Sequence, residues 1–302
     1  MVDVVGAFAC SHAALLLTRA AQAPEAQRRV IYDAFAEMGR QIVASKPDAI
    51  VIVGTDHGRI YPLSHVSQYT IGVSSMARGI GDAGLPLKDI RIHQAFAQEV
   101  LTGCLDAGID LAYSEAMTID HSFLTPLLLS MPELDIPIVP LVQNCNAPPL
   151  PTLRRSHAVG EALGEAIRRG QAGRVVVIGT GGLSHWVGSP AFQGFMTEPA
   201  GTRIERQKEY PLTLTDTGHV NEEFDRAFID VICHGKARQF LNEWDTDRVR
   251  AAAGNGAQEV RNWLLVAGVV QDRPGQLIAY EPVKEWLTGT ALVQFTHTEM
   301  RH

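Results

Sequence analysis

Short runs of apolar, often β-branched residues alternate with helical patterns along most of the 302 residues. This alternation constrains the fold more than any other feature, because it is typical of layered α/β proteins in which helices cover a central sheet. The runs that we expect to form strands span residues 2–10, 48–57, 69–73, 136–144, 174–179, 276–282 and 290–296.

The segments between these runs predict helices. Residues 26–45 carry apolar side chains at four-residue spacing, and similar patterns cover 89–107, 152–170 and most of 221–270. Residues 187–217 show little periodicity, so we expect a long surface excursion there. Since no repeat or linker divides the chain, the sequence predicts a single α/β domain over 1–302. It has a central mixed sheet flanked by helices and a helical C-terminal portion.

Composition excludes several classes of function. The formal net charge of −7 implies no broad basic face, so we expect no nucleic-acid partner and no membrane partner. The sequence contains no run of about 20 apolar residues, the length that spans a bilayer. The N-terminus has Asp3 where a signal peptide begins with basic residues. The four cysteines are far apart without C-x-x-C spacing, which fits a reducing compartment. We therefore expect a cytoplasmic protein.

Histidines stand where several of the predicted strands end. His12, His57 and His185 each follow such a strand, and His121 precedes the apolar run at 123–129. Ligands of open α/β sheets bind beyond the carboxyl ends of the strands, so these side chains should converge on a metal or catalytic cluster. In contrast, His65 in a loop and His157 within a predicted helix are expected to be solvated surface residues.

A site with open coordination usually needs a carboxylate beside two imidazoles, and the best local candidate is Glu259. Gly254 and Gly256 predict a tight turn before it, and a helix should start near Ala257. An acidic residue in a first helical turn can equally serve to compensate the helix dipole. Two histidines and one carboxylate suit Fe(II) in an oxygenase and also catalytic zinc, so the residues alone leave both open.

Two other patterns are set aside. Residues 79–84 read "GIGDAG", a literal match to the dinucleotide-binding fingerprint, but Leu85 and Pro86 follow where the fingerprint needs a helix to begin. A serine-hydrolase reading fails because the sequence has no G-x-S-x-G motif.

Five motifs in series resemble the class III extradiol ring-cleaving dioxygenases, the family of the protocatechuate 4,5-dioxygenase β subunit and 2,3-dihydroxyphenylpropionate dioxygenase. The similarity runs from near residue 5 to near residue 295. The motifs are "CSH" at 10–12, "TDHG" at 55–58, "IDHSFLTPL" at 119–127, "GTGGLSH" at 179–185 and "GNGAQEVRNW" at 254–263. Ser122 departs from the family, where glycine is usual after the histidine, and Trp186 stands where a polar Gln is usual.

The resemblance implies one catalytic domain over 1–302 with Fe(II) as cofactor. Its metal ligands would be His12, His57 and Glu259, and its catalytic residues would be His185 and His121. The implied reaction is extradiol cleavage of a catechol-type aromatic with O₂, in the degradation of aromatic compounds. Glycines 181 and 182, which lack Cβ atoms, would let substrate or backbone approach His185 closely.

The implied partners are O₂ and a small aromatic diol, an aminophenol or a dihydroxypyridine, and we expect a homo-oligomer. Arg59 and Arg78 could pair with a substrate carboxylate, although each could equally be a solvated loop charge. Two alternatives stay open: a zinc-dependent hydrolase that uses the same ligands, or a non-catalytic metal-binding homologue on the same fold.

Overall fold

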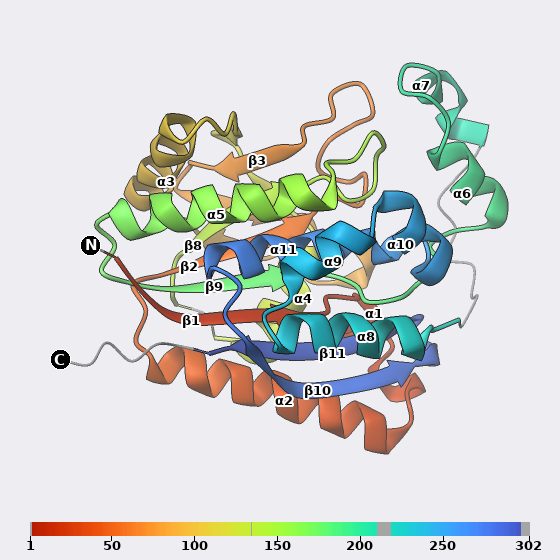
Figure 1. Ribbon diagram of the computed structural model, residues 1–302, viewed down its shortest axis with the longest axis horizontal. Helices are drawn as coiled ribbons and strands as arrows, with labels where there is room; N and C mark the ends of the chain where they lie inside the picture. The colour runs from red at the N-terminus through yellow and green to blue at the C-terminus, as the bar shows by residue number, and fades with distance from the viewer. Residues whose placement is uncertain (1, 134, 210–218, 297–302) are drawn as a thin grey trace.

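The large central sheet of the protein has eight strands, and helices flank it (Figure 1). The structure is a computed structural model that describes residues 2–133, 135–209 and 219–296. The strand order is β10-β11-β1-β9-β2-β8-β3-β6. In chain order these strands are β1 (Asp3–Cys10), β2 (Ala49–Thr55), β3 (Tyr69–Gly72), β6 (Ala112–Ser114), β8 (Ile138–Gln143), β9 (Arg174–Thr180), β10 (Gly275–Val283) and β11 (Thr288–Phe295).

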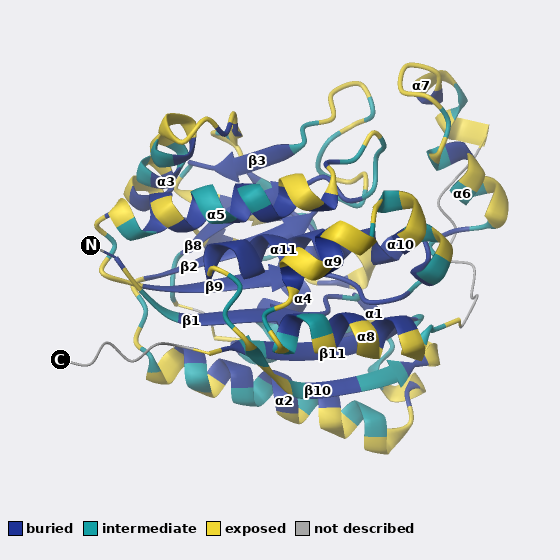
Figure 2. Cartoon of the chain, in the orientation of Figure 1, coloured by how far each residue is buried: buried dark blue, intermediate teal, exposed yellow. Residues whose placement is uncertain are grey.

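The sheet is mixed, as the sequence predicts. Strands β1, β9, β2 and β8 run parallel at its centre, while β11 is antiparallel to β1 and β3 is antiparallel to β8. Every residue of β2 is buried, which explains its continuous apolar run. Figure 2 shows the central strands as the buried layer of the molecule.

Helices cover both faces of this sheet. On one side, three helices pack against one another: α3 (Gln94–Asp106), α5 (Leu153–Arg169) and α11 (Val260–Val269). On the other side, α2 (Glu25–Ala44) lies against β10 and β11, and α4 (His121–Ser130) lies against β2. Helices α5 and α11 approach closely because Gly160 has no side chain: a Cβ there would lie 1.9 Å from the carbonyl oxygen of Leu265.

The C-terminal portion is mostly helical before the last two strands, which confirms the prediction. It contains α8 (Glu222–Cys233), α9 (Ala237–Glu243), α10 (Thr246–Ala253) and the 3₁₀ turn η4 (Gly256–Glu259), which leads into α11. Among the described residues, no helix has both the length and the apolar character that crossing a bilayer requires.

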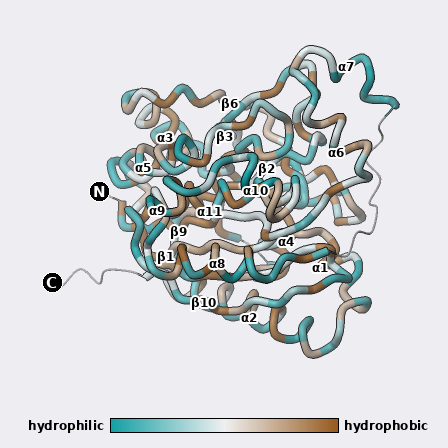
Figure 3. The backbone as a smooth tube through the Cα atoms, turned by 45° about the vertical axis from the view of Figure 1, so that its right-hand side comes forward, coloured by the Kyte–Doolittle hydropathy of each residue, from teal (hydrophilic) through white to brown (hydrophobic). Residues whose placement is uncertain are grey.

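The segment expected to be a surface excursion stands out from the sheet in both Figure 1 and Figure 3. It contains α6 (Pro190–Met196), α7 (Arg203–Arg206) and η3 (Gln207–Glu209), and its residues 210–218 lie outside the described ranges. The short helices within it were not predicted.

A second, three-stranded sheet was also not predicted. Its order is β5-β4-β7, with β4 (Met76–Gly79), β5 (Asp89–Arg91) and β7 (Thr118–Ile119). Strand β5 occupies the start of the segment predicted as one helix over 89–107. Such short strands carry too few residues for a clear alternation. The remaining elements are α1 (Leu15–Thr18), η1 (Ala20–Gln22), η2 (Asp82–Gly84) and η5 (Lys284–Trp286).

The expectation for the two other histidines is half right. His65 is exposed, but His157 is only 3% exposed, and its Nε2 atom lies 2.7 Å from the Asp272 carboxylate. The prediction was wrong because His157 lies on the face of α5 that packs against α11, where a buried imidazole needs such a partner.

Candidate metal centre and active site

Three neighbouring strands deliver three of the expected histidines to one edge of the sheet. Strands β1, β9 and β2 are adjacent and parallel, so their carboxyl ends meet. His12 follows β1 by two residues, His57 follows β2 by two, and His185 follows β9 after a glycine turn. The convergence expected from the sequence therefore rests on the strand order, which the sequence does not specify.

His12 and His57 meet at the carboxylate of Glu259, which η4 supplies from the other end of the chain. The Nε2 atom of His12 lies 3.2 Å from Oε2 of Glu259, and the Nε2 atom of His57 lies 3.0 Å from Oε1. Glu259 is 1% exposed. Glu259 therefore does not serve mainly to compensate the helix dipole, because its buried carboxylate lies between two imidazoles.

The ring of His12 is oriented by Thr180 at the end of β9. The Thr180 hydroxyl lies 2.8 Å from the carbonyl oxygen of Ser122, 3.2 Å from that of Val53 and 3.1 Å from Nδ1 of His12. Because the single hydroxyl proton is donated to a carbonyl, the hydroxyl oxygen accepts from His12, whose Nδ1 must then carry a proton. The Nε2 lone pair of His12 is left facing Glu259.

His57 is oriented in the same sense by Asp120, whose Oδ2 lies 2.9 Å from Nδ1 of His57. A carboxylate only accepts, so Nδ1 carries the proton and Nε2 faces Glu259. Burial disfavours charge on His57, but the carboxylates of Asp120 and Glu259 outweigh it and raise the pKa of His57 well above its ordinary value. For His12 burial prevails and lowers the pKa. The site therefore favours a positive charge beside Glu259.

Glu259 itself is held ionised. Burial opposes this, yet His12, His57 and His185 together lower the pKa of Glu259 well below its ordinary value. The backbone N–H of Gly182 donates to Oε2 over 2.7 Å. The donor set is two imidazole nitrogens and one anionic carboxylate, and it fits a divalent transition metal. Each of the three side chains is also held by a second hydrogen-bond partner: Thr180, Asp120 or Gly182.

His121 lies against this cluster at the first residue of α4. Its ring stacks on that of His57 with centroids 4.0 Å apart, and its ligand atom lies within 4.8 Å of those of His12 and His57. The three histidines are thus a second geometrically possible metal group, and Asp82, Asp120 and His121 are a third. Ser122, the departure from the family pattern, accepts from the Thr55 backbone N–H over 3.2 Å and donates to the Thr55 carbonyl over 2.8 Å, which ties α4 to β2.

His185 is held by a segment that sequence reasoning identified only as a tight turn. Its Nδ1 atom lies 2.9 Å from the Leu183 carbonyl oxygen, so this nitrogen donates and Nε2 is left available. The His185 backbone donates to Ala253 and accepts from Gly256. A Cβ at Gly256 would lie 2.1 Å from Nε2 of His185. Gly256 is therefore the residue that makes room for the ring.

At Gly181 the structure shows another neighbour than the expected His185. A Cβ at Gly181 would lie 2.6 Å from Cβ of Glu259, so this glycine makes room for the Glu259 side chain. Gly182 has a φ of 51°, in the left-handed region that favours glycine. The turn after β9 thus serves both Glu259 and His185.

Sequence reasoning missed Asp225, a fully buried residue of α8. Its Oδ1 accepts from the backbone N–H of Ser184 over 2.8 Å, and its Oδ2 accepts from the Ser184 hydroxyl over 2.9 Å and the Tyr280 hydroxyl over 3.0 Å. These bonds anchor the residue that precedes His185. An acidic residue on the apolar face of a predicted helix was the signal that could have revealed it.

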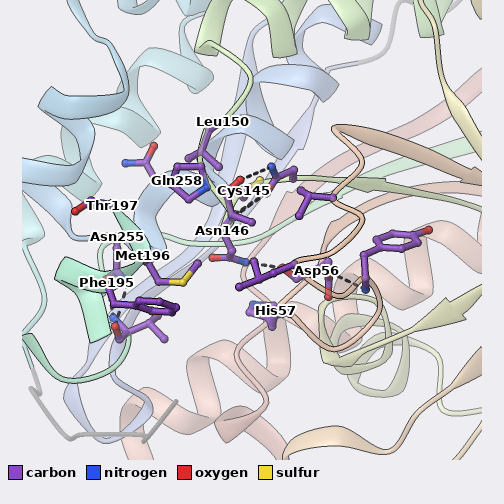
Figure 4. A pocket seen from close by; sticks show the side chains of 18 of the residues that line it. Asp56, His57, Cys145, Asn146, Leu150, Phe195, Met196, Thr197, Asn255 and Gln258 are labelled. Atoms are coloured by element: carbon purple, nitrogen blue, oxygen red, sulfur yellow. Dashed lines mark hydrogen bonds between the residues drawn. The ribbon is translucent and has the colours of Figure 1, made fainter. Parts of the chain in front are cut away.

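A cavity of about 420 Å³ opens beside His57 (Figure 4). The lining combines apolar side chains with amides and two arginines, one of which, Arg59, had been considered as a partner for a substrate carboxylate. Arg78 is exposed on β4 and is not part of the lining. The apolar side chains are Leu63, Val66, Val142, Leu150, Val187, Phe192, Phe195 and Met196, and the polar ones include Arg59, Asn144, Asn146, Arg250, Asn255 and Gln258.

Comparison with known proteins identifies the family. Residues 6–292 match the family described as "Catalytic LigB subunit of aromatic ring-opening dioxygenase". Two similar proteins carry the name 2,3-dihydroxyphenylpropionate/2,3-dihydroxicinnamic acid 1,2-dioxygenase. The protein from Photorhabdus laumondii is 29% identical over 293 residues, which cover 89% of this chain and 91% of the relative. The protein from a Rhodococcus species is 29% identical over 294 residues, which cover 88% and 91%.

A solved structure of an uncharacterized protein from Escherichia coli K12 shares the fold, with a TM-score of 0.57 over 97% of this chain and 100% of that chain. At 17% identity this likeness concerns the fold alone. The family match, in contrast, spans nearly the whole chain and includes every residue of the candidate site. The chain therefore belongs to the family of catalytic subunits of aromatic ring-opening dioxygenases, and it is an extradiol dioxygenase of aromatic catabolism.

Proposed function

We propose that this enzyme holds Fe(II) through His12, His57 and Glu259 and cleaves a catechol-type ring next to its diol. Family membership implies a metal cofactor, an aromatic diol and O₂. The observation that carries the ligand assignment is the convergence of two Nε2 atoms on one buried carboxylate, at 3.2 and 3.0 Å. Without a cation or a proton between them, lone pairs and an anionic oxygen repel each other.

The ligand set suits iron because two histidines and one carboxylate leave coordination positions open on one face. When bound, Fe(II) would hold the diol and O₂ together and carry electrons from one to the other. The protein's own contribution is to orient the substrate, exclude water and move protons.

We assign those proton transfers to His185 and His121. His185 presents Nε2 while its Nδ1 is occupied by the Leu183 carbonyl, so it can accept a proton from the diol. His121, stacked on His57, is placed to return a proton when the ring opens. Two histidines on separate elements, α4 and the turn after β9, allow acid and base to act in one turnover.

The cavity beside His57 is the proposed substrate site. Its apolar side chains suit an aromatic ring, and Arg59 offers a charge for an anionic substituent. The named relatives act on a dihydroxyphenyl compound that carries a carboxylate side chain. We therefore infer a carboxylated catechol as the first substrate to test, with aminophenols and dihydroxypyridines after it.

The chain is further proposed to act as one catalytic domain, as a homo-oligomer and in the cytoplasm. The free thiols Cys10, Cys104 and Cys145 are buried and suit a reducing compartment. Strand β6 ends the sheet with Tyr113 exposed, a suitable edge for contact between copies. Light scattering of the purified protein tests the oligomer directly.

The experiment is anaerobic reconstitution with Fe(II), followed by oxygen uptake against a panel of catechols, aminophenols and dihydroxypyridines. We expect uptake with stoichiometric formation of a ring-opened product that absorbs near the visible range. The activity should be lost in His185→Ala and kept in His234→Ala, whose histidine is exposed directly after the end of α8. Full turnover with zinc in place of iron, or no uptake by iron-loaded protein across the panel, would contradict the proposal.

A further inference from the structure

The stretch 79–84, which reads like a dinucleotide fingerprint, has a different use in the structure. Gly81 and Gly84 have φ values of 67° and 86°, in the left-handed region that glycine adopts readily. Between them, η2 carries Asp82 to the N-terminal end of α4. The side chain of Asp82 is 7% exposed. The glycines thus form a tight turn around a nearly buried carboxylate.

Asp82 contacts His121 at two points. Its Oδ1 accepts from the His121 backbone N–H over 2.9 Å, and its Oδ2 lies 2.5 Å from Nδ1 of the same residue. A carboxylate oxygen only accepts, so Nδ1 carries the proton. The free nitrogen of the ring is then Nε2, on the far side of the imidazole from Asp82.

Capping of the helix can explain the backbone contact but not the ring contact. Helix α4 already has an N-cap, because Oδ1 of Asp120 accepts from the Ser122 backbone N–H over 2.8 Å. The other oxygen of Asp120 holds His57. Each of the two stacked imidazoles therefore has its own carboxylate on Nδ1, and Asp82 provides the one for His121.

We propose that Asp82 is a positioning residue for ring cleavage, which fixes the orientation and tautomer of His121 so that its Nε2 lone pair can take up a proton and return it when the ring opens. This inference rests on the proposed role of His121 in proton transfer. A histidine held in the wrong tautomer presents an N–H where the reaction needs a lone pair, or the reverse, and loses most of its catalytic contribution.

Two substitutions separate the backbone contact from the ring contact. In Asp82→Asn the amide oxygen can still accept from the His121 backbone N–H, which directs the amide NH₂ toward Nδ1 and favours the tautomer protonated at Nε2. Asp82→Ala removes both contacts. Asp110→Asn is the matched control, since Asp110 is exposed just before β6.

The first readout is the tautomer of His121, which needs no activity. It is measured by ¹H–¹⁵N correlation of the histidine rings at mildly alkaline pH without added metal, with His121→Gln identifying the signals. We expect a proton on Nδ1 in the native protein and in Asp110→Asn, and on Nε2 in Asp82→Asn. A native ring protonated at Nε2, or a tautomer unchanged in Asp82→Asn, overturns the inference.

The second readout is turnover of the iron-loaded enzyme on whichever diol the panel identifies. Asp82→Asn should lower kcat by about 10- to 1,000-fold with KM within about threefold, since acid–base catalysis contributes at this scale. A purely structural Asp82 would leave Asp82→Asn close to native and damage only Asp82→Ala. If Asp82→Asn is native-like while His121→Gln is inactive, the inference fails and the proposed function stands. If His121→Gln turns over normally, the catalytic role of His121 fails, and the inference fails with it.

Discussion

The carboxylate of Asp120 binds His57 twice, through the backbone N–H at 3.1 Å and through ring Nδ1 at 2.9 Å. Asp120 is fully buried, which would raise its pKa, but His57 and His121 hold that pKa well below its ordinary value. A buried ionised carboxylate on Nδ1 fixes the ring and makes Nε2 a stronger ligand. Although Asp120 precedes His121 in the sequence, its carboxylate holds the ring of His57, and the ring of His121 is held by Asp82.

Replacing Asp120 with asparagine should weaken metal binding without abolishing it. The amide cannot supply the negative charge that raises the basicity of His57, and the loss of such a partner typically costs 10- to 100-fold in affinity. Competition with a metal-binding dye measures this. Asp106→Asn, on the exposed end of α3, should leave the affinity unchanged. Native affinity in Asp120→Asn would show that Asp120 serves only the fold.

Metal content separates the ligand group that contains Glu259 from the groups that contain His121. If Glu259 is a ligand and His121 is not, then Glu259→Ala should retain little iron after reconstitution and gel filtration. His121→Ala should retain close to one iron per chain yet turn over slowly. Elemental analysis of both variants decides the question. Iron lost from His121→Ala but kept in Glu259→Ala would assign the centre to one of the two groups that contain His121, either with His12 and His57 or with Asp82 and Asp120.

Gly256→Ala should displace the ring of His185. The new methyl group would lie 2.1 Å from Nε2, too close for any real contact, so the ring must turn away from its present position. We expect kcat to fall by at least about tenfold while iron content is kept, because the proposed function has His185 move protons and does not use it as a metal ligand. Gly194→Ala is the control, as a Cβ there would meet nothing within 4 Å. Native kcat in Gly256→Ala would argue against a role for His185.

Asp225 should make the free energy of unfolding depend on pH. Burial raises its pKa from 3.8 to about 6, against the hydrogen bonds from Ser184 and Tyr280. Above about pH 4 the unfolded carboxyl group loses its proton while the folded one keeps it. The contribution of Asp225 is therefore full below pH 4 and is lost as the pH rises through 6. The expected change is on the order of 2–3 kcal/mol.

The comparison with Asp225→Asn isolates this contribution, because asparagine does not titrate. Urea unfolding of both proteins from pH 4 to pH 7 should show the native protein losing stability relative to the variant by that amount. A difference that stays constant over this range would mean that the pKa of Asp225 is not raised in the folded protein.

Much of the architecture could be predicted because it depends on local patterns. The strand ranges 2–10 and 48–57 follow from continuous runs of apolar residues, which are typical of strands buried on both faces of a sheet. The structure confirms β1 and β2 there. The small sheet of β4, β5 and β7 escaped prediction, since strands of two to four residues have no readable period.

For the site, local patterns already predict that His12, His57 and His185 follow strands. They also offer Glu259 as the best carboxylate candidate, which the family resemblance supports. Strand order and the packing of distant segments decided the rest. They placed Asp82 on His121, and they placed Gly256 under His185 although 71 positions separate them in the chain. Such contacts depend on atoms brought together only by the fold, and no local pattern records which partner a buried carboxylate or a missing side chain will meet.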